Sequence, residues 1–191
     1  MSRADAAELR ADAARNREAL LQAATRTFAA SATEPSMRAV AREAGVGIAT
    51  LYRHFPTREA LVAAVYQNQV ERLTRQAGEL LRRLAPSEAL RAWMDLFGEW
   101  IMTKHGMVDT LRSMINSGEI AHTETRDELL AAVTGILDAG RAAGDLRSDV
   151  AADDIAAALI GIFTVTAGQS ERTGRLLDLL VDGLRPRNLE G

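Results

Sequence analysis

Apolar residues recur along most of the chain at three- and four-residue spacing, and this pattern constrains the fold most strongly. In residues 16–30, for example, Leu20, Ala24 and Phe28 fall on one stripe of a helix. Ala, Leu, Arg and Glu, which favour helices, dominate the sequence, and no convincing stretch alternates apolar and polar residues as a half-buried strand does. We therefore predict an all-α fold.

The ends of the helices follow from capping residues, glycines and prolines. Ser36 suits an N-cap, Gly45 suits the left-handed residue after a helix, and Pro86 ends a long helix that begins at Arg58. The predicted helices span about 16–30, 37–44, 48–54, 58–84, 87–104, 107–116, 123–142, 151–168 and 171–184. Residues 1–15 are rich in Ala, Arg and Asp, and we expect them to form a flexible N-terminal arm.

Composition excludes several classes of protein. A hydrophobic content of 47% with 26% charged residues is typical of a globular chain with a proper core, and a net charge of −3 does not favour a general nucleic-acid binder. The chain has no cysteine and three scattered histidines, so we expect no disulfide, no metal and no cofactor. The longest uncharged apolar run, residues 155–167, is shorter than the roughly 20 residues that cross a bilayer. These features predict a cytoplasmic protein with no membrane partner.

The segment GVGIATLYRHF, residues 45–55, gives the most specific functional signal. A short helix, the three-residue turn 45–47 and a second short helix form a helix-turn-helix. Leu51 and Phe55 face the preceding helices. The opposite face carries a set that suits the major groove of DNA: Ile48, Ala49, Tyr52 and Arg53. The small side chain of Ala49 permits close approach, and Arg53 can reach guanine or phosphate.

Arg58 follows Thr57, the expected N-cap of the next helix. The helix dipole disfavours a cation in this first turn, and a DNA phosphate beside it would explain the placement because free backbone N–H groups and the guanidinium would both bind it. The alternative is an ordinary ion pair of Arg58 with Glu34 or another nearby carboxylate.

The stretch SMRAVAREAGVGIATLYRHFPTREAL, residues 36–61, resembles the DNA-binding motif of the TetR family of bacterial one-component transcriptional regulators. The resemblance implies that residues 16–60 form a helix-turn-helix DNA-binding domain. It also implies the two sets of contacts: Arg38, Thr50, Tyr52, His54 and Arg58 on phosphates, and Ile48, Ala49 and Arg53 facing bases. Two features depart from the family pattern, since Gly47 replaces the usual Ser or Thr cap and residues 35–37 replace a Thr-rich helix start.

For residues 61–191 the resemblance implies a helical ligand-binding and dimerisation domain, with the homodimer formed by the last two helices. The residues agree, because DIAAALIGIFTVTAG and RLLDLLVDGL are apolar on more than one face and so need more than one partner. Bulky residues are the candidates for binding a small-molecule effector: Trp93, Phe97, Trp100, Met114 and Phe163. The spacing of 93, 97 and 100 fits a plain core stripe equally well.

We therefore predict a sequence-specific DNA-binding transcriptional regulator, a repressor that a small-molecule effector releases from an inverted-repeat operator in double-stranded DNA. The sequence has no catalytic signature, since it lacks cysteine, a glycine-rich phosphate loop and a histidine beside paired carboxylates, so we expect no catalytic residues. Two alternatives stay open. One is a helical ligand-binding protein or enzyme that keeps the fold without regulated DNA binding, and the other is a regulator that responds to a protein partner.

Overall fold

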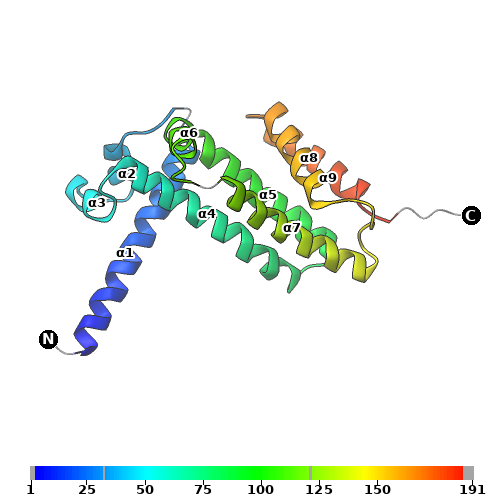
Figure 1. Ribbon diagram of the computed structural model, residues 1–191, viewed down its shortest axis with the longest axis horizontal. Coiled ribbons are helices and arrows are strands. Elements are labelled where there is room, and N and C mark those ends of the chain that lie inside the picture. The colour runs from blue at the N-terminus through cyan, green and yellow to red at the C-terminus, as the bar shows by residue number, and fades with distance from the viewer. Residues whose placement is uncertain (1–2, 32, 121, 187–191) are drawn as a thin grey trace, which may run out of the picture. The chain divides into compact units, whose positions relative to one another are not determined.

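The structure is a computed structural model that describes residues 3–31, 33–120 and 122–186, which form nine helices and no strand (Figure 1). The helices are α1 (Arg3–Ala29), α2 (Met37–Glu43), α3 (Ile48–His54), α4 (Arg58–Leu81), α5 (Pro86–His105), α6 (Val108–Asn116), α7 (His122–Ala143), α8 (Ala152–Val165) and α9 (Ser170–Gly183). The prediction of an all-α fold is confirmed.

The first helix is longer than we predicted. It begins at Arg3 rather than near Asn16, so the expected helix start is wrong. The physical reason is local: residues 3–15 contain six Ala and three Arg, which favour helix, and no Gly or Pro that would stop it. The flexibility of residues 1–15 stays a prediction, and Met1 and Ser2 lie outside the described residues.

The long fourth helix ends at Leu81, slightly before the predicted end at Leu84. The N–H groups of Arg83 and Leu84 both turn back to the carbonyl oxygen of Leu80, at 3.0 and 2.9 Å, which closes the helix in a tight turn. Pro86 then opens α5, a favoured position because its missing N–H would have no partner inside the helix.

The chain divides into two compact units. Unit 1 comprises Met1–Gln69 and Met102–Ile120, and therefore holds α1, α2, α3, the first half of α4 and α6. Unit 2 comprises Val70–Ile101 and Ala121–Gly191, with most of α5 and all of α7, α8 and α9. The functional division that we expect at residue 60 stays a prediction.

Each unit has its own apolar core. In unit 1 the fully buried side chains include Leu20, Phe28, Val40, Leu51, Leu61 and Met107. In unit 2 they include Trp93, Met94, Ile136, Ile155, Leu159 and Leu177. Within the described residues no helix combines the length and the apolar character needed to cross a membrane.

Candidate nucleic-acid interface

The helix-turn-helix of unit 1 is built by local capping. The Ser36 Oγ accepts a hydrogen bond from the Ala39 N–H at 3.2 Å, so the predicted N-cap of α2 is present. Gly45 has φ of +68°, and the Val46 N–H donates to the Ala41 carbonyl at 3.0 Å, which is the bond pattern of a glycine-terminated helix. The turn therefore leaves α2 in the geometry that directs the chain into α3.

Helix α3 has one anchored face and one open face. Leu51 is fully buried and Phe55, directly after the helix, is 2% exposed. Tyr52 is 45% exposed, and Ala49 and Arg53 are also exposed. In Figure 1, α3 lies at the outer edge of unit 1, beside α2. The open face thus combines a small residue, an aromatic hydroxyl and a guanidinium, a combination that can enter a DNA groove.

The remaining residues predicted on α3 lie nearer the core. Ile48, Thr50 and His54 are half-buried. The Arg53 Nη2 donates to the Thr50 Oγ1 at 2.9 Å. This bond holds the Arg53 side chain along the helix, because the two residues are three positions apart.

Two further arginines of unit 1 are exposed. Arg38, predicted as a phosphate contact, is exposed on α2. The guanidinium carbon of Arg17 on α1 lies 5.3 Å from the centroid of the Phe55 ring, so an exposed cation sits beside the C-terminal end of α3. The contact of Arg17 could not be predicted from the sequence, because periodicity places it only on the polar face of a helix and cannot bring residues 17 and 55 together.

Arg58 begins α4 as predicted, and the Ala60 N–H donates to the Thr57 Oγ1 at 3.1 Å, which makes Thr57 the N-cap. The Arg58 Nη1 lies 3.2 Å from a carboxylate oxygen of Glu34, and its Nη2 donates to the Pro35 carbonyl. The ion pair that the sequence left open as an alternative is therefore present. The phosphate contact of Arg58 stays a prediction.

The bulky residues predicted for effector binding divide between the two units. In unit 2 the ring centroids of Trp93 and Phe97 are 5.6 Å apart, those of Phe97 and Trp100 are 5.3 Å apart, and those of Phe97 and Phe163 are 6.1 Å apart. We call these four residues the aromatic cluster. Met114 belongs to unit 1, where it is 4% exposed.

The aromatic cluster is packed by its own side chains. Trp93, Phe97 and Trp100 are at most 5% exposed, and the Trp93 Nε1 donates to the Leu73 carbonyl at 3.0 Å. Phe163 on α8 is half-buried. Its ring packs against Gly98 so closely that a Cβ added to Gly98 would lie 2.6 Å from two of the ring carbons. Phe163 is therefore the least enclosed member of the cluster.

A groove of about 450 Å³ between α5 and α9 of unit 2 has a different character. Its lining is largely charged and includes Glu88, Arg91, Asp95, Asp178 and Arg185. None of the predicted effector-binding residues lines this groove. Among the described residues, no cluster of three or more His, Cys, Asp or Glu side chains is arranged to hold a metal ion.

A helix-turn-helix with an exposed second helix is typical of DNA-binding proteins, and comparison with known proteins specifies the class. A family model described as bacterial regulatory proteins, tetR family, matches residues 20–65. A second model, the C-terminal domain of SbtR-like transcriptional regulators, matches residues 85–186. A search of the curated proteins gives no match.

Solved structures of TetR regulators are similar to this chain over nearly its whole length. A TetR transcriptional regulator of Streptomyces coelicolor is 45% identical, with 89% of this chain and 98% of that chain covered and a TM-score of 0.81. A TetR regulatory protein of Mycobacterium vanbaalenii is 38% identical, with coverage of 93% and 99% and a TM-score of 0.73. A gamma-butyrolactone receptor, 20% identical with coverage of 93% and 92% and a TM-score of 0.59, shares the fold. The chain belongs to the TetR family of bacterial transcriptional regulators.

Proposed function

We propose that this regulator is a repressor that binds an inverted-repeat operator as a homodimer and leaves it when a small-molecule effector binds. The observation that carries the proposal is α3, a helix anchored by buried Leu51 and Phe55 that leaves Ala49, Tyr52 and Arg53 open to a DNA groove. We place its action in the cytoplasm, where bacterial operator DNA lies. The proposed activity requires no catalytic centre.

The exposed apolar side chains of α8 and α9 support the homodimer. Ile160, Val165 and Leu179 are 56%, 62% and 65% exposed, whereas Ile155 and Leu177 on the same helices are buried in unit 2. Helices that are apolar on both an inner and an outer face need a second partner. A twofold interface between two copies would cover the outer faces with identical surfaces.

The experiment that tests the function is a selection of genomic fragments by the purified protein. We expect the recovered fragments to share an inverted repeat, because a twofold dimer presents two copies of α3. The centres of its half-sites should lie about 34–36 Å apart or at a multiple of that distance. Recovery of fragments without inverted symmetry would contradict the proposal, and recovery of none would favour a ligand-binding protein that only keeps the fold.

We assign two roles to the side chains of this interface. Ile48, Ala49 and Arg53 read bases. The phosphate contacts come from Arg38, Thr50, Tyr52, His54 and Arg58, and we add Arg17 because the Phe55 ring holds its guanidinium next to α3.

The roles of Arg53 and Arg17 can be separated by substitution. Arg53→Ala should change which sequences bind, with a loss of about 1–3 kcal/mol of discrimination at the base it contacts. Arg17→Gln should weaken binding to every sequence and flatten the dependence of log K on log salt by about one unit. Titrations of operator and scrambled duplexes at several salt concentrations measure both effects. An equal loss on both duplexes for Arg53→Ala would refute its assignment to base reading.

We place the effector site at the aromatic cluster of unit 2, where the half-buried Phe163 ring would have to move aside to admit a small apolar molecule between α5 and α8. Met114 is the least supported member of the predicted set, since it belongs to unit 1. The effector must bind the DNA-free form more tightly, and a coupling of about 1–3 kcal/mol corresponds to a five- to 150-fold change in operator affinity. Helix α4 runs without a break from Arg58 to Leu81, and we propose that it transmits the change.

Phe163→Ala tests this placement with little damage to the core, since the ring is only half-buried. Compounds that raise the melting temperature of the wild-type protein are first found in a panel of small apolar molecules. The variant should lose this rise in melting temperature and keep its operator affinity in the absence of compound. Leu96→Ala, at a half-buried residue of α5 outside the aromatic cluster, serves as the control. If the compound raises the melting temperature of Phe163→Ala as much as that of the wild type, the effector binds outside the aromatic cluster.

A further inference from the structure

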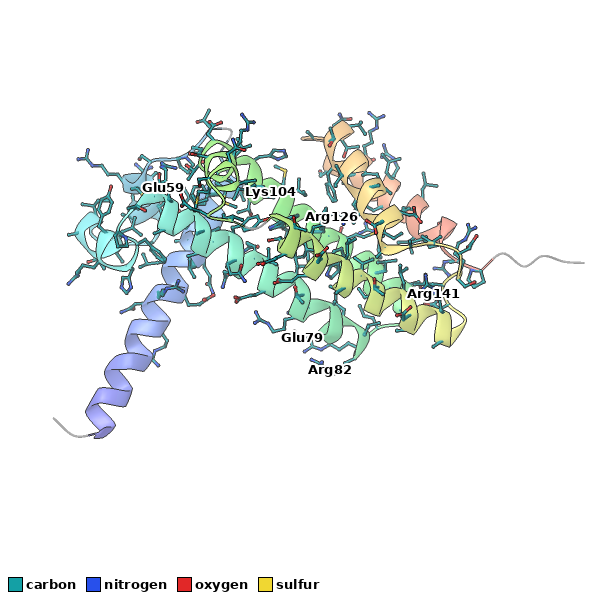
Figure 2. The ribbon with its side chains drawn as sticks, in the orientation of Figure 1. Glu59, Glu79, Arg82, Lys104, Arg126 and Arg141 are labelled. Atoms are coloured by element: carbon teal, nitrogen blue, oxygen red, sulfur yellow. The ribbon has the colours of Figure 1, made fainter. Side chains whose placement is uncertain are left out.

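The carboxylate of Glu34 joins three elements of unit 1. Glu34 lies in the segment between α1 and α2, Arg58 opens α4, and Thr110 lies in the first turn of α6. The Thr110 N–H donates to Oε1 of Glu34 at 2.8 Å, and the Thr110 hydroxyl donates to Oε2 at 2.8 Å. The same Oε2 accepts from the Arg58 Nη1 at 3.2 Å. In Figure 2 the labels of Glu59 and Lys104 mark the start of α4 and the end of α5 just before α6.

Glu34 supplies the cap that α6 lacks. The N-cap residue of α6 is Met107, and no side chain within the helix start caps it. A carboxylate that accepts a first-turn N–H fills this role and also interacts favourably with the positive end of the helix dipole. The side chain of Glu34 is 16% exposed and Thr110 is 9% exposed, so water competes little for these bonds.

The second role of this carboxylate is to oppose the charge of Arg58. The Arg58 side chain is 26% exposed, and its contacts with Glu34 and the Pro35 carbonyl use two of the five N–H donors of the guanidinium. A negative charge so close to Arg58 reduces its attraction for a DNA phosphate, because the phosphate interacts with the sum of both charges. Glu34 therefore opposes the phosphate contact that we propose for Arg58.

We propose that Glu34 is a positioning residue that couples the first turn of α6 to the phosphate contact of Arg58. This inference rests on the proposed function, because it needs Arg58 to face DNA. While Thr110 donates two hydrogen bonds, the carboxylate is shared between α6 and Arg58. When the first turn of α6 moves away, both carboxylate oxygens become available to Arg58, whose fork geometry favours a bidentate pair. Arg58 is then withdrawn from the phosphate and DNA binding weakens.

Glu34→Gln tests the charge and preserves the shape. The amide oxygen can still accept from the Thr110 N–H, and the amide NH2 can donate to the Thr110 hydroxyl, but the negative charge beside Arg58 is gone. We expect affinity for duplex DNA to rise about three- to tenfold at low salt, with the slope of log K against log salt steeper by about one unit. A duplex of arbitrary sequence suffices as the probe, because a phosphate contact does not depend on sequence.

Thr110→Val tests the shared hydrogen bond from the other side. Valine keeps the shape of threonine but removes the hydroxyl donor, so Oε2 of Glu34 is left to Arg58 alone. We expect DNA affinity to fall about two- to tenfold, the range that corresponds to one hydrogen bond. Thr110→Ser retains the hydroxyl and should bind DNA as the wild type does. In the Glu34→Gln background, Thr110→Val should have no further effect on the salt slope.

The decisive measurement repeats both changes in an Arg58→Ala background, where both effects on DNA affinity should disappear. Effects that persist without Arg58 overturn the proposal. Variants that bind DNA with the wild-type salt slope and show only a lower melting temperature also overturn it, since Glu34 would then be a cap for α6 and nothing more. If Arg58→Ala itself leaves the DNA affinity and the slope of log K against log salt unchanged, Arg58 does not contact a phosphate. The proposed coupling through Glu34 is then refuted as well. A wild-type protein that binds no DNA is a separate result, which refutes the proposed function itself.

Discussion

Replacing Leu179 by arginine should convert the proposed dimer into a monomer and lower its affinity for the full operator about a hundredfold or more. Leu179 is 65% exposed on α9, so the folded chain tolerates a long charged side chain there. A twofold interface would bring the new arginine beside its own copy or bury it among apolar groups, and both are costly. Losing the second half-site removes the avidity of linked binding, which is worth about 10²- to 10⁴-fold.

Sedimentation and operator titration measure this result, and two controls make it specific. Leu84→Arg alters another exposed leucine, one that lies between α4 and α5, and should leave both the oligomeric state and the affinity unchanged. A duplex that carries a single half-site should bind the Leu179→Arg monomer with the intrinsic affinity of one helix-turn-helix. If the Leu179→Arg variant still sediments as a dimer, Leu179 of α9 does not lie in the dimer interface.

Replacing Gly106 by alanine should destabilise unit 1 by about 3 kcal/mol, at the upper end of the usual cost of overpacking. A Cβ at this position would lie 2.0 Å from the carbonyl oxygen of Phe28 and 2.6 Å from its carbonyl carbon. These are backbone atoms, so no side-chain rotation relieves the clash, and the end of α1 has to move away from the connection between α5 and α6. Phe28 is 1% exposed, and moving it would open the core of unit 1.

Chemical and thermal denaturation measure this effect, which corresponds to a fall in melting temperature of roughly 6–12 °C for a chain of this size. Gly135→Ala provides a control of opposite sign. Gly135 lies inside α7, it does not have the positive φ that favours glycine, and a Cβ there would meet nothing within 4 Å. Alanine should therefore stabilise that helix by about 0.5–1 kcal/mol. Equal stability of the two variants would show that the backbone at Phe28 can shift to make room for the new Cβ at little cost in free energy.

The helix-turn-helix could be predicted because its determinants are local. Ser36 caps the residue three positions ahead, Gly45 adopts its left-handed conformation at the end of its own helix, and Leu51 and Phe55 share a face through helical spacing alone. The start of α1 shows the limit of local signals. Residues 3–15 favour helix by their Ala and Arg content, but composition alone does not show that the helix extends to Arg3, so the predicted start near Asn16 was wrong.

The proposed DNA-binding surface was only partly predictable, because two contacts near it join residues far apart in the chain. Arg17 meets the Phe55 ring across 38 positions, and Glu34 binds the Thr110 N–H across 76 positions. Helical periodicity tells which face of a helix is polar, but it does not tell which helix that face will meet. For this reason the sequence left two possible partners for Arg58, a DNA phosphate or a carboxylate such as Glu34. It gave no indication that Glu34 also contacts α6.

The sequence by itself determined the all-α fold, the turn between α2 and α3 and the resemblance to the TetR family, since capping, glycine conformation and apolar spacing act within a few residues. Tertiary structure alone decided which polar groups share a hydrogen-bond partner and which two segments of the backbone lie in contact. Gly106 shows the difference: in the sequence it is a break between two helices, and in the folded chain its missing Cβ lets the connection between them touch the backbone at Phe28. Such a contact depends on the path of the whole chain, because sterics act between neighbours in space whatever their separation in sequence.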